Sequence, residues 1–176
     1  MPSPLGHFIG GVAAGWLVAG APALSSPPTK PQGGLWREAL VFGALGMIPD
    51  LDLIGPFHRG PSHSLAAAVA VGAVGWLVVR VPATLALAAM AAYASHILLD
   101  WLGQDTSAPS GIMALWPASQ AYFESGLNVF LAISRRYHQG WPFVRANFVA
   151  VIRELAILGS LLAIIAATRR RRSRKA

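Results

Sequence analysis

The chain has 176 residues, of which 55% are hydrophobic and only 12% are charged. With a mean hydropathy of +0.52, this composition excludes an ordinary soluble domain and is typical of a polytopic membrane protein, here a single domain over residues 1–176. The net charge of +7 lies mostly in a basic tail at residues 169–176, directly after an apolar run. That position favours a membrane stop signal over a nucleic-acid site.

The apolar segments predict an all-helical membrane bundle of about five spans, at residues 5–24, 35–48, 64–79, 83–102 and 148–168. No lysine or arginine precedes the first segment, so we expect a retained span and not a cleaved signal peptide. Prolines and glycines interrupt the connection at residues 103–147, which we expect to be a helical or irregular segment at the membrane interface. Within it, residues 120–137 have a pattern compatible with an amphipathic surface helix.

Basic residues indicate how the spans are oriented. If successive spans alternate in direction, Lys30, Arg37, Arg80 and the basic tail share one face. The positive-inside rule assigns that face to the cytoplasm. We therefore expect a plasma (inner) membrane protein with its N-terminus outside and its C-terminus in the cytoplasm.

The few acidic residues lie beside the histidines. The chain has only seven Asp and Glu residues and five histidines. The alternating spans bring most of these residues to the extracytoplasmic surface, although the topology was not chosen to do so: His7, His58, His63, His96, Asp50, Asp52, Asp100 and Asp105. Because there is no cysteine, a metal would be bound through imidazole nitrogens and carboxylate oxygens.

His96 and Asp100 form the sharpest local signal. Residues four apart on a helix project from the same face about one turn apart, so these two side chains can bind one cation. A simple His–Asp hydrogen bond near a helix end is the alternative. The cost of placing ionisable groups in an apolar span favours a functional role.

Two turns add further candidate ligands. A proline-aspartate turn places Asp50 and Asp52 at the C-terminal end of a helix, where a carboxylate is unfavourable unless a cation compensates. The next turn, at residues 58–64, supplies two imidazoles, a guanidinium and two hydroxyls. We expect Ser62 or Ser64 to cap the third span.

An early His, a Pro-Asp-x-Asp turn, a His-Arg-Gly-x-x-His-Ser segment and a His-x-x-x-Asp helix end follow one another between residues 5 and 117. This order resembles the YdjM-type inner-membrane metal-dependent hydrolase family, which is more distantly similar to zinc-dependent phospholipase C. The resemblance implies that one or both aspartates of the turn join the metal ligands, which are His7, Asp50, Asp52, His63, His96 and Asp100. The later His-x-x-x-Glu pair of those phospholipases is missing, since only His138 follows Asp105, so we expect one or two ions and not three.

The residues and the resemblance together predict a hydrolase acting on a phosphoester of a lipid or lipid-linked molecule, with membrane lipids as partners. The bound cation, for which a mixed His and Asp set favours zinc, would activate a water and polarise the scissile oxygen. We expect Asp52 or Asp105 to orient or deprotonate that water, and Arg59 to pair with a phosphate oxygen. His58 is either a substrate-facing side chain or a solvated turn histidine.

Two other functions use the same residues. An ion or solute transporter would need ionisable groups that continue through the bilayer, whereas the middle portions of the first, third and fourth spans are almost purely apolar. A non-catalytic membrane protein with a structural metal would have every coordination position filled. An open position and an accessible cavity would favour chemistry.

Overall fold

The computed structural model describes residues 1–20, 33–54 and 59–173. No strand forms among them, so the all-helical prediction is confirmed for this part of the chain. The helices, in chain order, are α1 (Pro4–Ala19), α2 (Gly33–Met47), η1 (Ile48–Ile54), η2 (Pro61–His63), α3 (Leu65–Leu77), α4 (Ala83–Leu102), η3 (Tyr137–Gln139), α5 (Trp141–Glu154), η4 (Leu155–Gly159) and α6 (Ser160–Ser173). The first three η elements are 3₁₀-helices, and η4 is a π-helical stretch that joins α5 to α6 in one long rod.

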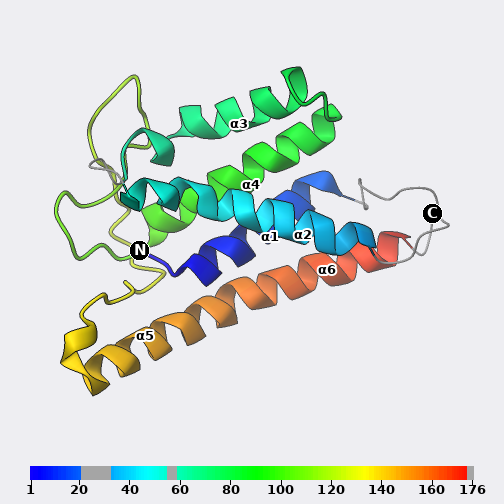
Figure 1. Cartoon of the computed structure of the whole chain (residues 1–176). Helices are drawn as coiled ribbons and strands as arrows, with labels where there is room; N and C mark the ends of the chain where they lie inside the picture. Colours follow the sequence, from blue (N-terminus) through cyan, green and yellow to red (C-terminus); the bar gives the residue numbers. More distant parts are fainter. Residues whose placement is uncertain (21–32, 55–58, 174–176) are drawn as a thin grey trace.

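The helical rods run side by side and alternate in direction (Figure 1). α1 packs against both α2 and α4, while α3 covers another side of α4 and α6 lies against α1. One end of the bundle carries the start of α1, the elements η1 and η2, and the long connection after α4. The opposite end carries the start of α2, the turn from α3 to α4, and the end of α6.

Serine side chains set where two helices begin. Ser3 caps α1 by accepting a hydrogen bond from the Gly6 N–H at 3.0 Å. Ser64 caps α3 in the same way, with the Ala67 N–H at 3.1 Å. Each cap satisfies a backbone donor that the first helical turn leaves unpaired. Of the two serines considered for the third span, Ser64 is the cap.

Glycines bring α1 and α2 into backbone contact. A Cβ atom on Gly46 of α2 would overlap the His7 carbonyl oxygen, and one on Gly11 of α1 would overlap the Phe42 carbonyl oxygen. Small residues between membrane helices allow their backbones to approach each other this closely. It places His7 directly beside the end of α2, where the first acidic turn begins.

Within the described ranges, two helices are long and apolar enough to cross a membrane: α4 and the rod that covers residues Trp141–Arg171. α1 and α3 are also apolar but shorter. Large hydrophobic side chains project outward, including Trp36 on α2, Trp76 on α3 and Phe148 on α5. The described helices lie where the spans were predicted, apart from residues 21–24, which are outside the described ranges. A crossing by all five stays a prediction.

The predicted amphipathic helix at residues 120–137 is wrong. This stretch is irregular until η3, because Gly126 and Asn128 adopt positive φ angles of 68° and 50° that interrupt a right-handed helix. Its backbone bonds to other segments instead, and the Val129 N–H donates to the Leu102 carbonyl at 2.8 Å. The connection is therefore anchored to the end of α4.

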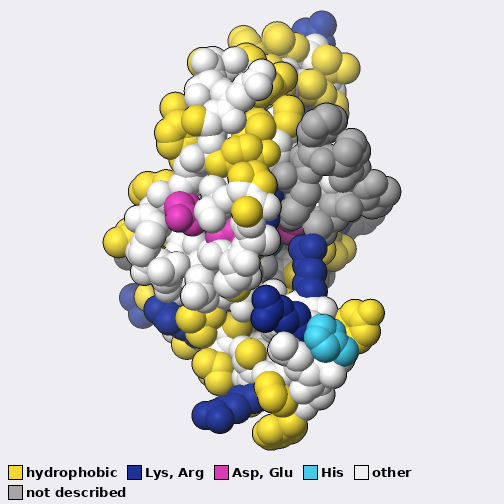
Figure 2. Space-filling view, turned by 90° about the vertical axis from the view of Figure 1, so that its left-hand side faces the viewer, with side chains coloured by type: hydrophobic (Ala, Val, Ile, Leu, Met, Phe, Trp, Pro, Cys, Tyr) yellow, Lys and Arg dark blue, Asp and Glu magenta, His cyan; other side chains and the backbone are white. Residues whose placement is uncertain are grey.

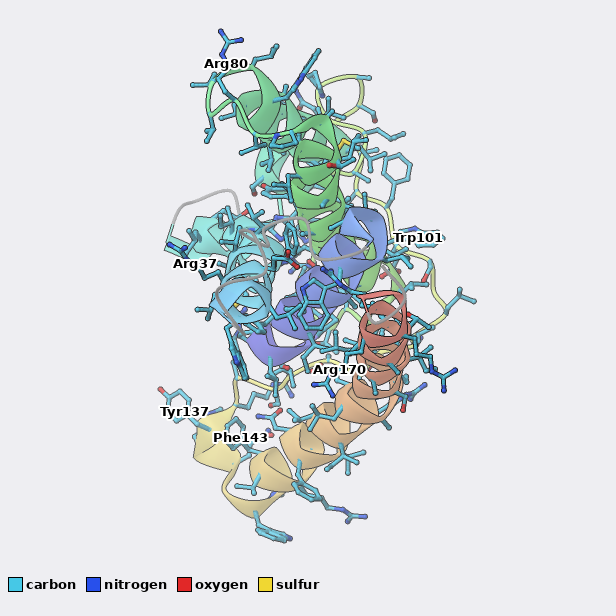
Figure 3. The ribbon with its side chains drawn as sticks, turned by 90° about the vertical axis from the view of Figure 1, so that its right-hand side faces the viewer. Arg37, Arg80, Trp101, Tyr137, Phe143 and Arg170 are labelled. Carbon is cyan, nitrogen blue, oxygen red and sulfur yellow. The ribbon has the colours of Figure 1, made fainter. Side chains whose placement is uncertain are left out.

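Several basic side chains lie at the end of the bundle opposite these loops. Figure 3 views this end and labels Arg37 of α2, Arg80 of the turn between α3 and α4, and Arg170 of α6. Arg169 is buried there, where its guanidinium pairs with Glu38 at 2.7 Å and lies 5.1 Å from the Trp16 ring centroid. Of the basic residues predicted to share one face, Arg37, Arg80 and the arginines that end α6 lie at this end, while Lys30 and residues 174–176 are outside the described ranges. The assignment of this end to the cytoplasm stays a prediction.

Candidate metal centre

Asp50, His63, His96 and Asp100 come together at the loop-covered end of the bundle. One ligand atom from each lies within 4.8 Å of all the others. His63, His96 and Asp100 are buried, while the Asp50 side chain is 23% exposed. The group therefore has one side that faces outward. In Figure 2, which looks at this end, the visible acidic side chains lie near the middle of the face.

Three local structures deliver these side chains. Asp50 lies in η1, the 3₁₀ turn at Ile48–Ile54 that ends α2. His63 is the last residue of η2, immediately before the Ser64 cap of α3. His96 and Asp100 are one turn apart on α4, and the Asp100 Oδ2 lies 3.1 Å from the His96 Nε2. The predicted i, i+4 pair is thus formed on the buried face of its helix.

The ligand atoms have separations suited to one cation. The His63 Nε2 lies 3.0 Å from the His96 Nε2 and 3.5 Å from the Asp100 Oδ2. The Asp50 Oδ1 lies 3.7 Å from both imidazole Nε2 atoms. Ligand atoms at ordinary zinc bond lengths around a tetrahedral ion are about 3.3 Å apart. Two carboxylates would also balance the charge of a divalent ion, so these four residues could hold one.

The outer nitrogens of the two imidazoles are held by acceptors. The His96 Nδ1 lies 2.8 Å from the Gly46 carbonyl oxygen, which can only accept, so this nitrogen carries the proton. The His63 Nδ1 lies 3.1 Å from the Asp52 Oδ2. Protonation at Nδ1 directs the Nε2 lone pairs at the centre of the group, as is usual for metal-binding histidines. Asp52 thus contacts the far side of a candidate ligand.

His7 lies against this group without belonging to it. Its ring stacks on His96 with centroids 3.8 Å apart, and its Nε2 lies 3.3 Å from the Asp100 Oδ1. The ring is 1% exposed, and its Nδ1 has no hydrogen-bond partner among the described residues, whereas its Nε2 faces Asp100. Burying an unpaired polar group is costly. This fits a site that a cation completes, because Asp100 presents one oxygen to His7 and the other to His63 and His96.

Carboxylates control the protonation of His63. Burial lowers the pKa of this imidazole, but the hydrogen bonds that it donates to Asp50 and Asp52, together with the charges of Asp100 and Asp52, outweigh burial and raise the pKa to about 9. For Asp50, burial raises the pKa, but the hydrogen bond from His63 and the charges of His96 and His7 together lower it by more, so the net shift is downward. Without a metal, a proton on the His63 Nε2 can be shared with the His96 Nε2. That proton occupies the position in which a cation would sit.

Arg59 and Asp105 pair with each other. The guanidinium contacts the Asp105 carboxylate and also donates to the Ser107 Oγ at 2.7 Å. Burial raises the pKa of Asp105. The backbone N–H groups of Gly111 and Ser107 and the Arg59 charge together lower it by more, so the net shift is downward. The backbone N–H of Arg59 donates to Asp52 at 3.0 Å. The pair thus fastens the connection after α4 to the turn that carries His63. The predicted catalytic roles of both residues stay predictions.

The turn before α3 has supports that sequence reasoning missed. The Ser62 Oγ donates to the Asp52 Oδ2 at 2.6 Å, and the Tyr93 hydroxyl donates to the Ser62 carbonyl at 2.7 Å.

Glu154 was also missed. It is buried at the start of α1, where its carboxylate accepts hydrogen bonds from the Ser3 N–H and hydroxyl. An acidic residue inside an apolar helix was the available signal for Glu154.

Two histidines lie elsewhere. His58 is outside the described residues. His138 is exposed in η3, and it belongs to no group of candidate ligands among the described residues. The part of the chain that the structure describes thus assembles four of the six predicted ligands into one group, with His7 and Asp52 in contact with its members.

The sequence matches the family described as YdjM inner membrane protein over residues 1–175. It matches none of the curated proteins and none of the solved structures with which it was compared. The more distant similarity to zinc-dependent phospholipase C stays a prediction. The matched range includes every residue of the candidate metal centre.

Proposed function

Because the chain belongs to the YdjM inner membrane protein family, we propose that it is a membrane-embedded, metal-dependent hydrolase acting on a phosphoester or lipid-linked substrate. The observation that carries the proposal is the group of His63, His96, Asp100 and Asp50. Its first three members are buried and its fourth is partly exposed. A buried mixed His and Asp set with one accessible side is the arrangement that metal-assisted hydrolysis requires.

The chain's own residues have separate tasks in this proposal. His63, His96 and Asp100 hold the cation, and the ion, for which zinc is our preferred identity, supplies an activated water and polarises the scissile oxygen. Asp50 lies on the side from which water and substrate enter. Asp52 orients His63 through its contact with the Nδ1, and we assign it the second task of accepting a proton from water.

The Arg59–Asp105 pair is assigned a positioning task. Its hydrogen bonds connect the turn that carries His63 to the long connection, so it fixes the approach to the outward side of the group. Arg59 is 7% exposed and its guanidinium is already paired with the Asp105 carboxylate. We assign this guanidinium the further task of pairing with a phosphate oxygen of the substrate, for which it would exchange part of that contact.

A metal-supplemented hydrolysis screen tests the proposal. Purified protein would be incubated with Zn²⁺ or Mn²⁺ and with phospholipids, phosphomonoesters and other lipid-linked substrates. We expect product from at least one class, loss of it in Asp100→Ala, and retention in the exposed-site control His138→Ala. Equal product from wild-type protein and Asp100→Ala would contradict the proposal.

A structural metal is the second candidate function. The specific observation that favours it is that four protein ligands are available, which is the number that fills a tetrahedral structural site. Cobalt-substituted protein separates the two, because its visible absorption reports the ligands of the ion. A spectral change on adding inorganic phosphate would indicate an open position, as hydrolysis requires. An unchanged spectrum would support a structural role.

A further inference from the structure

An apolar groove of about 580 Å³ lies along the outer flank of α4. Its floor is formed by small or flat residues of that helix, among them Ala91, Ala94 and Ser95, with Ala14 of α1 at one edge. Its far wall is formed by residues of the connection after α4 and by the start of α3: Ile112, Ala114, Leu115, Phe123 and Leu65. A volume of this size is in the range of ligand-binding sites.

The chemistry of the lining excludes a polar ligand. Among the described residues that line it, Ser95 has the only hydroxyl, which donates to the Ala92 carbonyl of its own helix at 2.7 Å, and no side chain is charged. Leu98 and Leu65 are 52% and 51% exposed at its mouth, so the groove is open along its side. Only hydrocarbon would gain by filling it.

Backbone hydrogen bonds fix the wall of the groove. Ile112 and Phe123 exchange N–H to carbonyl bonds of 3.0 and 2.9 Å, and the Leu65 N–H donates to the Ala114 carbonyl at 2.9 Å. The same wall continues to the candidate metal centre, because the Met113 N–H donates to the Arg59 carbonyl at 3.1 Å. The groove is thus built into the fold next to that centre.

The length and direction of the groove match one lipid tail. Its lining residues on α4 run from Ala91 to Trp101, a rise of about 15 Å at the helical repeat. This is about half of the ~30 Å hydrocarbon core of a bilayer, and hence about one leaflet. α4 is itself one of the two helices able to cross a membrane. A chain in the groove would lie parallel to this helix, as lipid tails do.

The end of the groove lies beside the candidate metal centre. Trp101 follows Asp100 in sequence, and Ile97 follows His96. Trp101 lies at the edge of the bundle in Figure 3 and is 39% exposed, in keeping with the preference of indole rings for the boundary between hydrocarbon and water. The headgroup of a lipid held by its tail would therefore lie at the level of the ligands.

We propose that this groove binds one hydrocarbon tail of a membrane lipid and so selects lipid-linked substrates for the metal group beside it. The selection rests on the proposed hydrolase function, whereas the binding of the tail does not. The chemical class is a molecule with a long saturated or isoprenoid chain and a phosphorylated head. The groove recognises the chain, and the metal group with the neighbouring Arg59 recognises the head.

Photo-crosslinking tests tail binding independently of activity. The full chain would be reconstituted into phosphatidylcholine vesicles in which some molecules carry a diazirine near the end of one acyl chain, and labelled peptides would be identified by mass spectrometry. We expect labels concentrated in residues 91–101 and 112–123. Labels spread evenly over the exposed faces of all the helices would overturn the proposal. Groove labelling by a diazirine-bearing apolar peptide, with no groove labelling by the lipid, would also overturn it.

Variants sharpen this experiment. Ala94→Trp fills the groove and should lower its labelling several-fold, whereas Ala163→Trp, at an exposed position of α6, should leave it unchanged. If Ala94→Trp does not fold, Leu98→Gln provides a second test. It changes an already exposed position at the mouth of the groove and should also lower the labelling. Unchanged labelling in both groove variants would overturn the proposal. Groove labelling without hydrolysis of any substrate would refute the hydrolase function alone, and hydrolysis without groove labelling would refute the groove alone.

Discussion

Asp52 is expected to act on the metal through His63. Its Oδ2 contacts the His63 Nδ1 and accepts hydrogen bonds from the Arg59 N–H and the Ser62 hydroxyl. Asp52→Asn keeps the shape of the side chain but removes its charge. We expect the affinity for Zn²⁺ to fall by about 10- to 100-fold, as is typical for carboxylates that orient a metal-binding histidine.

Competition with a chromophoric chelator would measure this change. Glu124→Gln is the matched control, because Glu124 is exposed on the connection after α4, and its affinity should equal that of wild-type protein. A wild-type affinity in Asp52→Asn would show that the contact with His63 does not matter. Complete loss of binding would instead identify Asp52 as a direct ligand.

The affinity for the metal should depend on pH through His63. The pKa of this imidazole is raised to about 9 in the metal-free protein, so below that pH a proton must leave before the ion binds. The apparent affinity should therefore rise with pH, by up to about tenfold per unit, and level off near the raised pKa. Calorimetric titrations with Zn²⁺ would measure it. A plateau already reached near the ordinary histidine pKa would contradict this arrangement.

Individual contacts of the site differ in how far sequence could predict them. His96 and Asp100 were predictable because helical spacing alone places them on one face. The pair of Arg59 and Asp105 was not, because it joins residues far apart in sequence through the path of an irregular connection. The Gly46 carbonyl was equally hidden, since a backbone acceptor leaves no mark in the residue types.

At the scale of helices, the contact between α1 and α2 positions the site. Gly46→Ala would force its Cβ against the His7 carbonyl oxygen, and the backbone there cannot move without moving His7 and the Gly46 carbonyl that holds His96. We expect a loss of about 1–3 kcal/mol of stability, typical of overpacking, together with weaker metal binding.

Gly159→Ala is the control for this substitution, because a Cβ at Gly159 meets nothing within 4 Å. It should leave both properties unchanged or stabilise the helix slightly. Thermal unfolding in detergent, with and without Zn²⁺, would compare the two variants. Equal melting temperatures for Gly46→Ala and Gly159→Ala would show that α1 and α2 can move apart at Gly46 at no cost to the site.

Helix positions were largely predictable and the connection was not. α4 occupies residues 83–102 as predicted, since a long apolar run after Pro82 has only one reasonable beginning. The apolar pattern at residues 120–137 misled because hydrophobic spacing says nothing about the positive φ angles of Gly126 and Asn128. Phe123 of this stretch lines the apolar groove and Phe130 packs against Leu99 of α4, although the stretch forms no helix before η3.

At the scale of the whole molecule, basic side chains lie at both ends of the bundle. Arg37, Arg80 and Arg170, followed in the chain by the basic tail, lie at the end opposite the candidate metal centre. The positive-inside rule then predicts that a reporter fused after Lys175 is cytoplasmic. Paired alkaline phosphatase and fluorescent protein fusions would measure this. Phosphatase activity from that fusion would invert the orientation and place the metal centre inside the cell.

The candidate metal centre and the proposed hydrolase both depend on whether these four residues hold a metal. Metal analysis of purified wild-type protein, His96→Ala and Asp100→Ala, with the exposed-site variant His138→Ala as control, tests this in one measurement. We predict about one or two divalent ions per chain in wild-type protein and His138→Ala, and loss of that metal in the other two variants. Full metal content in both His96→Ala and Asp100→Ala would contradict the candidate metal centre, and with it the proposed hydrolase.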